Sequence, residues 1–182
     1  MRRAEKGKVY LVGSGPGNPE LLTMRAVRLL ETADVVFHDD LVPDEVLALV
    51  HRSALVTSVG KRFGQPKITQ AGINALLIES ARAEQSVVRL KSGDPLVFGR
   101  AAEELAALRG AGISFEVVPG VTAALAASAV LGFPYLDGNC FRRLSCETRA
   151  RTFGQPCAHT LHQSSRGVDK LRSRRHQRIA SS

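Results

Sequence analysis

The 182-residue sequence lacks the features that define several large classes of protein. No apolar run approaches the roughly 18 residues that a membrane-spanning helix needs, so no membrane partner is expected. The basic N-terminus is interrupted by Glu5 and no apolar segment follows it before Gly7, which argues against a secretion signal. These absences favour a soluble, cytoplasmic protein.

Cysteine is scarce, and its spacing is uninformative. Cys140, Cys146 and Cys157 are the three cysteines of the chain, and an odd number argues against a disulfide framework. Their spacings of 6 and 11 residues match no common zinc pattern. Neither a metal site nor a disulfide framework is therefore expected.

Net positive charge is nearly absent from the first 134 residues and is concentrated at the C-terminal end of the sequence. Residues 1–134 hold 15 Lys and Arg against 14 Asp and Glu, whereas residues 135–182 hold 10 against 3. The segment 135–182 also has no run of four apolar residues and no amphipathic helix pattern. We expect it to be a disordered basic tail, or else the product of a reading-frame change near residue 134. Such a tail would bind nucleic acid only weakly and without specificity.

Apolar segments alternate with helix-forming segments through the first 134 residues. Strands are expected at 8–12, 33–37, 54–59, from 87, and at 113–118, and helices at 19–31, 43–50, 69–83, 101–109 and about 122–130. The first strand, 8–12, is apolar without a polar alternation, as in a parallel sheet that is buried on both faces. This pattern predicts an α/β fold with a parallel, helix-covered sheet.

The unusual residues follow the predicted strands. They lie in the segments 13–18, 38–42, 60–62 and 92–97, with a further loop at 119–123 before the last helix. Loops at the carboxyl ends of parallel strands meet at one edge of the sheet. The sequence therefore predicts one ligand crevice built from these loops.

The first loop, Gly13-Ser14-Gly15-Pro16-Gly17-Asn18, is similar to a dinucleotide-binding fingerprint but fails it, because Asn18 stands where the third glycine belongs. Gly15 and Gly17 still let the backbone come close to a ligand at the start of a helix. An ordinary tight turn between strand and helix is an equal alternative.

Two adjacent carboxylates, Asp39 and Asp40, end the second strand after His38. Successive side chains of a strand point to opposite faces, so at most one of the two faces a site. A solvated loop is the alternative interpretation. Lys61 follows Gly60 at the end of the third strand, and Thr122 is placed to cap the last helix and to contact a ligand.

Residues 7–134 resemble the uroporphyrinogen-III C-methyltransferases of the tetrapyrrole methylase family. The matching motifs are Val-Gly-Ser-Gly-Pro-Gly-Asn-Pro-Glu-Leu-Leu-Thr (12–23), Ala-Asp-Val-Val-Phe-His-Asp-Asp-Leu-Val (33–42), Val-Gly-Lys-Arg (59–62), Ile-Asn-Ala-Leu-Leu (73–77), Val-Val-Arg-Leu-Lys-Ser-Gly-Asp-Pro-Leu-Val-Phe-Gly-Arg (87–100) and Val-Val-Pro-Gly-Val-Thr-Ala-Ala (117–124). They occur in the family's order and at its spacing.

This resemblance implies methyl transfer from S-adenosylmethionine to ring carbons of uroporphyrinogen III, giving precorrin-2 for sirohaem and cobalamin synthesis, in a homodimer. Asp39 matches the family's proton-accepting aspartate and Lys61 its proposed proton-donating lysine. The cofactor contacts that it implies are Pro16, Ser92, Gly93, Asp94, Val97, Thr122 and Ala123. Because the substrate is a polycarboxylate, Lys61, Arg62, Arg89 and Lys91 are candidates for steering it.

The sequence departs from the family's pattern at three places. Ser92 stands where glycine is usual and His38 where tyrosine is usual, and family members continue into a second α/β domain that is largely missing here. The expected organisation is a methylase domain over 7–118, the start of a truncated second domain over 119–134, and the tail over 135–182. A catalytically inactive fragment and another tetrapyrrole methylase are the alternative functions.

Overall fold

The computed structural model describes residues 3–60 and 68–132. Lys61 and the tail 135–182, both singled out in the sequence, lie outside the described residues. The chain separates into two units, Met1–Phe133 and Pro134–Ser182, and the elements below belong to the first. In the part of the chain that the structure describes, no helix has the length and apolarity needed to cross a membrane.

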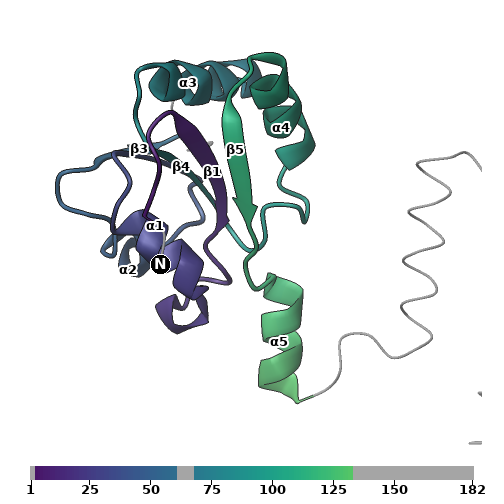
Figure 1. Ribbon diagram of the computed structural model, residues 1–182. Coiled ribbons are helices and arrows are strands. Elements are labelled where there is room, and N and C mark those ends of the chain that lie inside the picture. Colours follow the sequence, from purple (N-terminus) through teal and green to yellow (C-terminus); the bar gives the residue numbers. More distant parts are fainter. Residues whose placement is uncertain (1–2, 61–67, 133–182) are drawn as a thin grey trace, which may run out of the picture. The chain divides into compact units, whose positions relative to one another are not determined.

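A sheet of five parallel strands forms the centre of the first unit (Figure 1). Its order is β3-β2-β4-β1-β5, with β1 at Lys8–Gly13, β2 at Val35–His38, β3 at Leu55–Ser58, β4 at Val87–Lys91 and β5 at Ser114–Val118. Strand β4 thus lies between β1 and β2. The predicted α/β fold with a parallel sheet is confirmed.

Helices cover both faces of this sheet. The helices of the described residues are η1 at Pro19–Leu21, α1 at Met24–Leu30, α2 at Asp44–Leu47, α3 at Gln70–Arg82, α4 at Ala101–Gly110 and α5 at Ala123–Leu131. Helices α3 and α4 pack on the face that carries Val9, Leu11 and Phe37, whereas α1 and α2 pack on the face that carries Tyr10 and Val12. The alternation along each strand therefore divides the apolar side chains into two cores.

The helix predicted over 19–31 is interrupted. Asn18 accepts a hydrogen bond from the Glu20 amide at 2.9 Å and begins only the short 3₁₀ helix η1. Leu22 and Thr23 are extended, and the Thr23 hydroxyl accepts from the Ala26 amide at 3.2 Å to begin α1. The prediction of a single helix is wrong because a second capping residue starts the α-helix one turn later.

Threonine caps begin two of the later helices where the sequence predicted. Thr69 accepts from the Gly72 amide at 3.1 Å, and Thr122 accepts from the Leu125 amide at 3.4 Å. Helix α2 is a single turn, shorter than the helix predicted over 43–50, and no side chain caps it.

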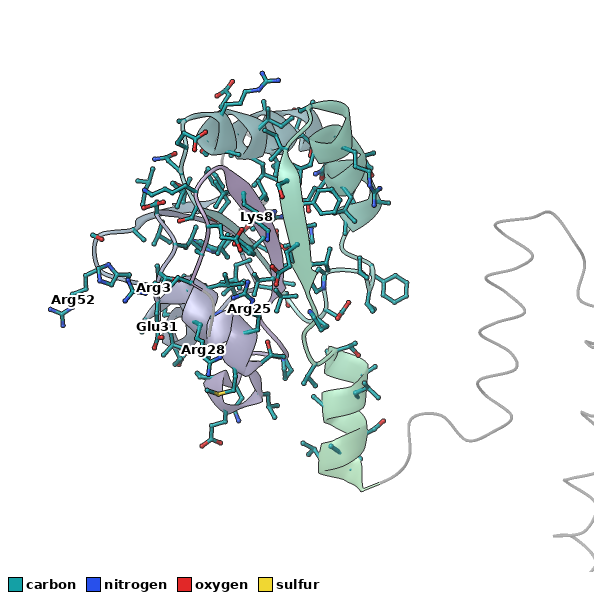
Figure 2. The ribbon with its side chains drawn as sticks, in the orientation of Figure 1. Arg3, Lys8, Arg25, Arg28, Glu31 and Arg52 are labelled. Carbon is teal, nitrogen blue, oxygen red and sulfur yellow. The ribbon has the colours of Figure 1, made fainter. Side chains whose placement is uncertain are left out.

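Figure 2 labels Lys8, on β1, and Arg25, on α1. Both form ion pairs with Glu116 on β5, the strand that pairs with β1. The Arg25 guanidinium donates to the Glu116 carboxylate at 3.0 and 3.1 Å, and the Lys8 ammonium lies at 3.3 Å. Hydrogen bonding by Arg25 holds the pKa of Glu116 below its ordinary value. Both cations also lie over the ring of Tyr10, which connects α1 to the edge of the sheet.

Asp34 connects the beginnings of β2 and β4. Its Oδ2 accepts from the hydroxyl of Ser86 at 2.6 Å and from the Ser86 amide at 2.7 Å, and Lys6 lies 3.2 Å from Oδ1. The hydrogen bonds from Ser86, first that from its hydroxyl, lower the pKa of Asp34 below its ordinary value. This carboxylate therefore stabilises the fold in its ionised form.

We expect Asp34→Asn to lower the free energy of unfolding at pH 7. The folded-state pKa of Asp34 is lowered, so its contribution to the free energy of unfolding is fully present above the unfolded-state pKa of about 4. That contribution is lost as the pH falls through the folded-state pKa. Urea unfolding at pH 7 and at about pH 3 measures this. The difference in unfolding free energy between Asp34→Asn and the parent should narrow at the lower pH, and an equal difference at both values would contradict the assignment.

Candidate functional site

The loops after β1, β4 and β5 meet at the carboxyl edge of the sheet, with the β4 loop in the middle. The Gly15 amide donates to the Gly93 carbonyl at 3.1 Å, and the Gly93 amide donates back to Gly15 at 2.9 Å. Both glycines have a positive φ, +67° for Gly15 and +68° for Gly93, which few other residues adopt. The two loops whose motifs the sequence singled out are therefore joined backbone to backbone.

Asp94 fixes the shape of the β4 loop and ties it to the β5 loop. Its Oδ1 accepts from the Leu96 amide at 2.8 Å, and its Oδ2 accepts from the Gly120 amide at 3.1 Å. The amide of Val97 donates to the Asp94 carbonyl at 3.1 Å, which closes a turn. Asp94 thus acts here as a bridge between loops, and the neighbouring backbone remains at the surface.

Gly13, Gly93 and Gly120 pack against one another through their backbones. A Cβ on Gly13 would lie 2.6 Å from the Gly93 carbonyl oxygen and 2.7 Å from the Gly120 Cα, closer than real side chains come. A Cβ on Gly120 would overlap the same carbonyl oxygen. The sequence did not single out Gly13 or Gly120 as site residues, although both lie in predicted loops.

Most of the predicted cofactor contacts surround this glycine cluster at the surface. Gly15 is buried in the cluster, and Gly93 and Asp94 are half-buried. Thr122 lies next to Gly93, since a Cβ added to Gly93 would lie 3.9 Å from the Thr122 Cα. The other predicted contacts are exposed or half-buried around it: Pro16, Gly17, Ser92, Val97 and Ala123. Three adjoining loops with close-packed backbones and exposed flanking residues suit a ligand that forms hydrogen bonds with the main chain.

Asp39 and Asp40 point to different partners, as the strand alternation predicts. Asp39 accepts a hydrogen bond from Nη2 of Arg89, and its side chain remains 32% exposed. The Asp40 carboxylate accepts from the hydroxyl of Ser58 at 2.8 Å. Asp39 is thus the carboxylate that lies on the β4 side, next to the loop cluster, and Lys61 lies outside the described residues.

His38 occupies a buried position beside these carboxylates. The residue is only 7% exposed, and the Nδ1 atom of its ring lies 2.9 Å from the Asp39 carbonyl oxygen. The ring therefore packs within the end of β2, where the family resemblance expects tyrosine. Within residues 3–60 and 68–132, no group of three or more His, Cys, Asp or Glu is placed to hold a metal ion.

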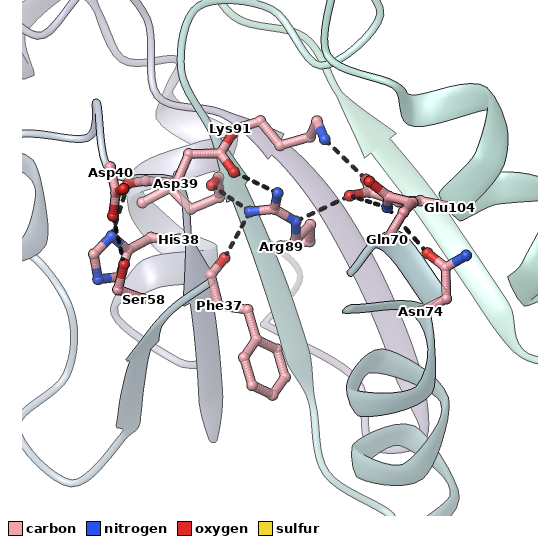
Figure 3. A network of polar contacts seen from close by, with 11 residues as sticks. Phe37, His38, Asp39, Asp40, Ser58, Gln70, Asn74, Arg89, Lys91 and Glu104 are labelled. Atoms are coloured by element: carbon pink, nitrogen blue, oxygen red, sulfur yellow. Dashed lines mark hydrogen bonds and ion pairs between the residues drawn. The ribbon is translucent and has the colours of Figure 1, made fainter. Parts of the chain in front are cut away.

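Arg89 and Lys91 lie in the interior, not at the surface (Figure 3). Arg89 is 3% exposed and Lys91 2%, and each donates to a different oxygen of Glu104 on α4, at 3.1 and 3.0 Å. The expectation that they steer the substrate from solvent is wrong. Because residues 89 and 91 share the strand face of Val87, they point at α3 and α4 and need a buried partner.

Glu104 is the residue of this cluster that the sequence reasoning missed. It is 1% exposed and also accepts from Nε2 of Gln70 at 3.3 Å. It lies three residues after Ala101 and one before Leu105, on the helix face that packs into the core. A charged residue at an apolar-face position was the available signal for a buried ion pair.

Comparison with known families agrees with this arrangement. A model of the tetrapyrrole (corrin/porphyrin) methylases matches residues 8–169, most of the chain. The chain belongs to the tetrapyrrole methylases. This methylase's central motif, the β4 strand and its loop, is thus the part on which the family resemblance and the loop geometry agree.

The curated relatives of this methylase include siroheme synthases. The protein of Psychrobacter sp. is 55% identical over 128 residues, which cover 70% of this chain and 26% of the relative. Siroheme synthase 1 of Klebsiella pneumoniae is 55% identical over 130 residues, which cover 71% of this chain and 28% of the relative. The methylase chain therefore spans less than a third of the curated relatives that it matches.

Solved structures give the same fold. Uroporphyrin-III-C-methyltransferase from Thermus thermophilus matches with a TM-score of 0.62 and 54% identity over 70% of this methylase and 54% of that chain. The same enzyme complexed with S-adenyl homocysteine matches with a TM-score of 0.58 and 50% identity, over 66% of this methylase and 48% of that chain. A cobalt precorrin-4 methyltransferase matches with a TM-score of 0.62 and 33% identity, over 69% of this methylase and 51% of that chain.

Proposed function

We propose that this methylase transfers methyl groups from S-adenosylmethionine to ring carbons of uroporphyrinogen III, giving precorrin-2 for sirohaem and cobalamin synthesis. The observation that carries the proposal is the cluster in which Gly15, Gly93, Asp94 and Gly120 join three loops at the carboxyl edge of the sheet. A 50% identical structure is described as complexed with S-adenyl homocysteine, the demethylated donor. Identities of 54–55% to the uroporphyrin-III and siroheme enzymes support this substrate.

The residues of this chain would bind and orient both reactants. Gly15, Gly93, Thr122 and their neighbours would hold the donor, and Asp94 keeps their loops in place. Bound S-adenosylmethionine supplies an activated methyl group. The tetrapyrrole loses a proton when a ring carbon gains that methyl group, and the partly exposed carboxylate of Asp39 is placed to accept it. In this proposal Lys61 donates a proton to the tetrapyrrole.

Another tetrapyrrole methylase is the second candidate, because the cobalt precorrin-4 enzyme has the same fold at 33% identity. Incubation with labelled donor and either uroporphyrinogen III or cobalt precorrin-4 distinguishes the two by the mass of the product. Methylation of the second substrate alone would overturn our proposal.

We also propose a cytoplasmic homodimer, for which light scattering should give twice the mass of the 19.6 kDa chain.

Calorimetry of the full 182-residue chain with S-adenosylmethionine and S-adenosylhomocysteine tests the donor site directly. We expect saturable binding of both. Folded protein with no detectable binding would contradict the proposal and favour the catalytically inactive alternative.

Asp94→Ala should weaken S-adenosylhomocysteine binding by about tenfold or more, since two loop amides lose a charged acceptor. Calorimetry of this variant and of Asp44→Ala measures the effect. Asp44 is an exposed carboxylate of α2 and serves as the matched control. Equal affinities of the two variants would show that the Asp94 bridge does not shape the site.

A further inference from the structure

Glu104 is a buried carboxylate that partners two buried cations. It lies on α4 among Ala101, Leu105 and Leu108, which pack in the core. An ionised group in such a place is costly unless it is paired and hydrogen-bonded. Its two oxygens meet these demands by dividing between two cations: Oε1 accepts from Arg89 Nε at 3.1 Å and Oε2 accepts from Lys91 Nζ at 3.0 Å.

Arg89 extends this pair across the sheet. Its Nε donates to Glu104, and its Nη2 donates to Asp39. Between these two contacts, Nη1 donates to the carbonyl oxygens of Phe37 at 3.4 Å and Leu90 at 3.1 Å. The guanidinium is planar and rigid, so holding its Nε edge also sets the direction of its Nη2 edge. Contacts at both edges leave Arg89 one orientation (Figure 3).

The cluster of Asp39, Arg89, Lys91 and Glu104 carries two charges of each sign, and only one member reaches the surface. The side chains of Arg89, Lys91 and Glu104 are 3% exposed or less, whereas that of Asp39 is 32% exposed. Asp39 also lies at the carboxyl end of β2, beside the loop cluster. A buried chain of contacts therefore ends on the carboxylate that the proposed reaction uses.

We propose that Glu104 is a positioning residue for methyl transfer: it fixes the Arg89 guanidinium, which in turn orients the Asp39 carboxylate toward the substrate. This inference rests on the proposed function of Asp39 as proton acceptor. Glu104 touches neither reactant. Its effect reaches the reaction across the sheet, from α4 through β4 to the end of β2.

Two variants separate positioning from simple stabilisation. Glu104→Gln removes the charge and leaves Arg89 and Lys91 with less compensation, so it can also impair folding. The double variant Lys91→Met/Glu104→Met removes one buried charge of each sign, and well-packed apolar replacements of buried ion pairs often leave stability unchanged or raised. It folds by this argument, yet the Nε of Arg89 loses its carboxylate partner. Glu103→Gln, the same change at an exposed neighbour on α4, is the matched control.

The first readout needs no activity: the carboxyl-carbon resonance of Asp39 in protein labelled with ¹³C at aspartate Cγ, assigned by its loss in Asp39→Asn. We expect this resonance to move in the double variant, and in Glu104→Gln where that protein folds, but to stay in place in Glu103→Gln. An unmoved resonance in the folded double variant would overturn the inference.

The second readout is methyl transfer to uroporphyrinogen III. We expect kcat to fall about tenfold or more in the double variant while KM for the donor changes less than about twofold. A folded double variant with the parent's kcat would show that Glu104 acts through stability alone. Failure of the parent chain to bind S-adenosylhomocysteine would instead contradict the proposed function, and the resonance would still decide whether Glu104 orients Asp39.

Discussion

Replacing Gly13 by alanine is expected to lower the free energy of unfolding by roughly 3 kcal/mol and to abolish measurable S-adenosylhomocysteine binding. The added Cβ would lie 2.6 Å from the Gly93 carbonyl oxygen and 2.7 Å from the Gly120 backbone. Its neighbours are main-chain atoms of two other loops, so no side chain can rotate away. Urea unfolding and calorimetry measure the two effects.

Gly110→Ala is the matched control for this substitution. Gly110 is the last residue of α4, has no atom within 4 Å of an added Cβ and does not have a positive φ. Alanine there should leave stability unchanged or raise it by up to about 0.5 kcal/mol, because alanine favours a helix over glycine. If Gly13→Ala behaved like Gly110→Ala, the three loops would not be packed backbone to backbone as described.

Asp39→Asn is expected to lower methyl transfer by about 10²-fold to 10⁴-fold, the usual contribution of a general base. Asparagine keeps the size of the side chain and an acceptor for Arg89 but cannot take up a proton. S-adenosylhomocysteine affinity should change less than about twofold, since Asp39 follows β2 and the proposed donor loops follow β1, β4 and β5. Kinetics and calorimetry together separate the two effects.

Asp44→Asn, at an exposed carboxylate of α2, should leave both quantities at the parent's values. Equal losses of transfer and of donor affinity in Asp39→Asn would count against the proton-accepting role and would indicate a collapse of the site. Unchanged transfer would remove Asp39 from the mechanism altogether.

The sheet could be predicted because each strand carries its own local signal. Residues 9–12 and 35–37 are apolar throughout, and their side chains are buried on both faces of the sheet in the structure. Thr69 and Thr122 were predictable helix starts, since capping depends on neighbours within a few residues. The interruption of the helix over 19–31 was missed because Asn18 and Thr23 are both good caps and local preference does not decide between them.

The candidate site was predicted in part. The loops after β1, β4 and β5 do meet, as expected for parallel strands, and Asp39 and Asp40 have different partners, as expected from side-chain alternation. Alternation alone did not say which of the two aspartates contacts β4. Arg89 and Lys91 were wrongly expected at the surface, whereas both are buried. Their spacing shows that they share a strand face, but the helix covering that face is known only when the chain is folded.

The sequence by itself therefore determined the α/β class, the loops that carry the motifs and the family to which the chain belongs, because these depend on local patterns. Only the tertiary structure decided that β4 lies between β1 and β2, that three glycines pack together and that Glu104 joins Arg89 to Asp39. The physical reason is that these contacts connect segments far apart in the chain. Side-chain burial and ion pairing at such contacts depend on which elements become neighbours, which no local pattern specifies.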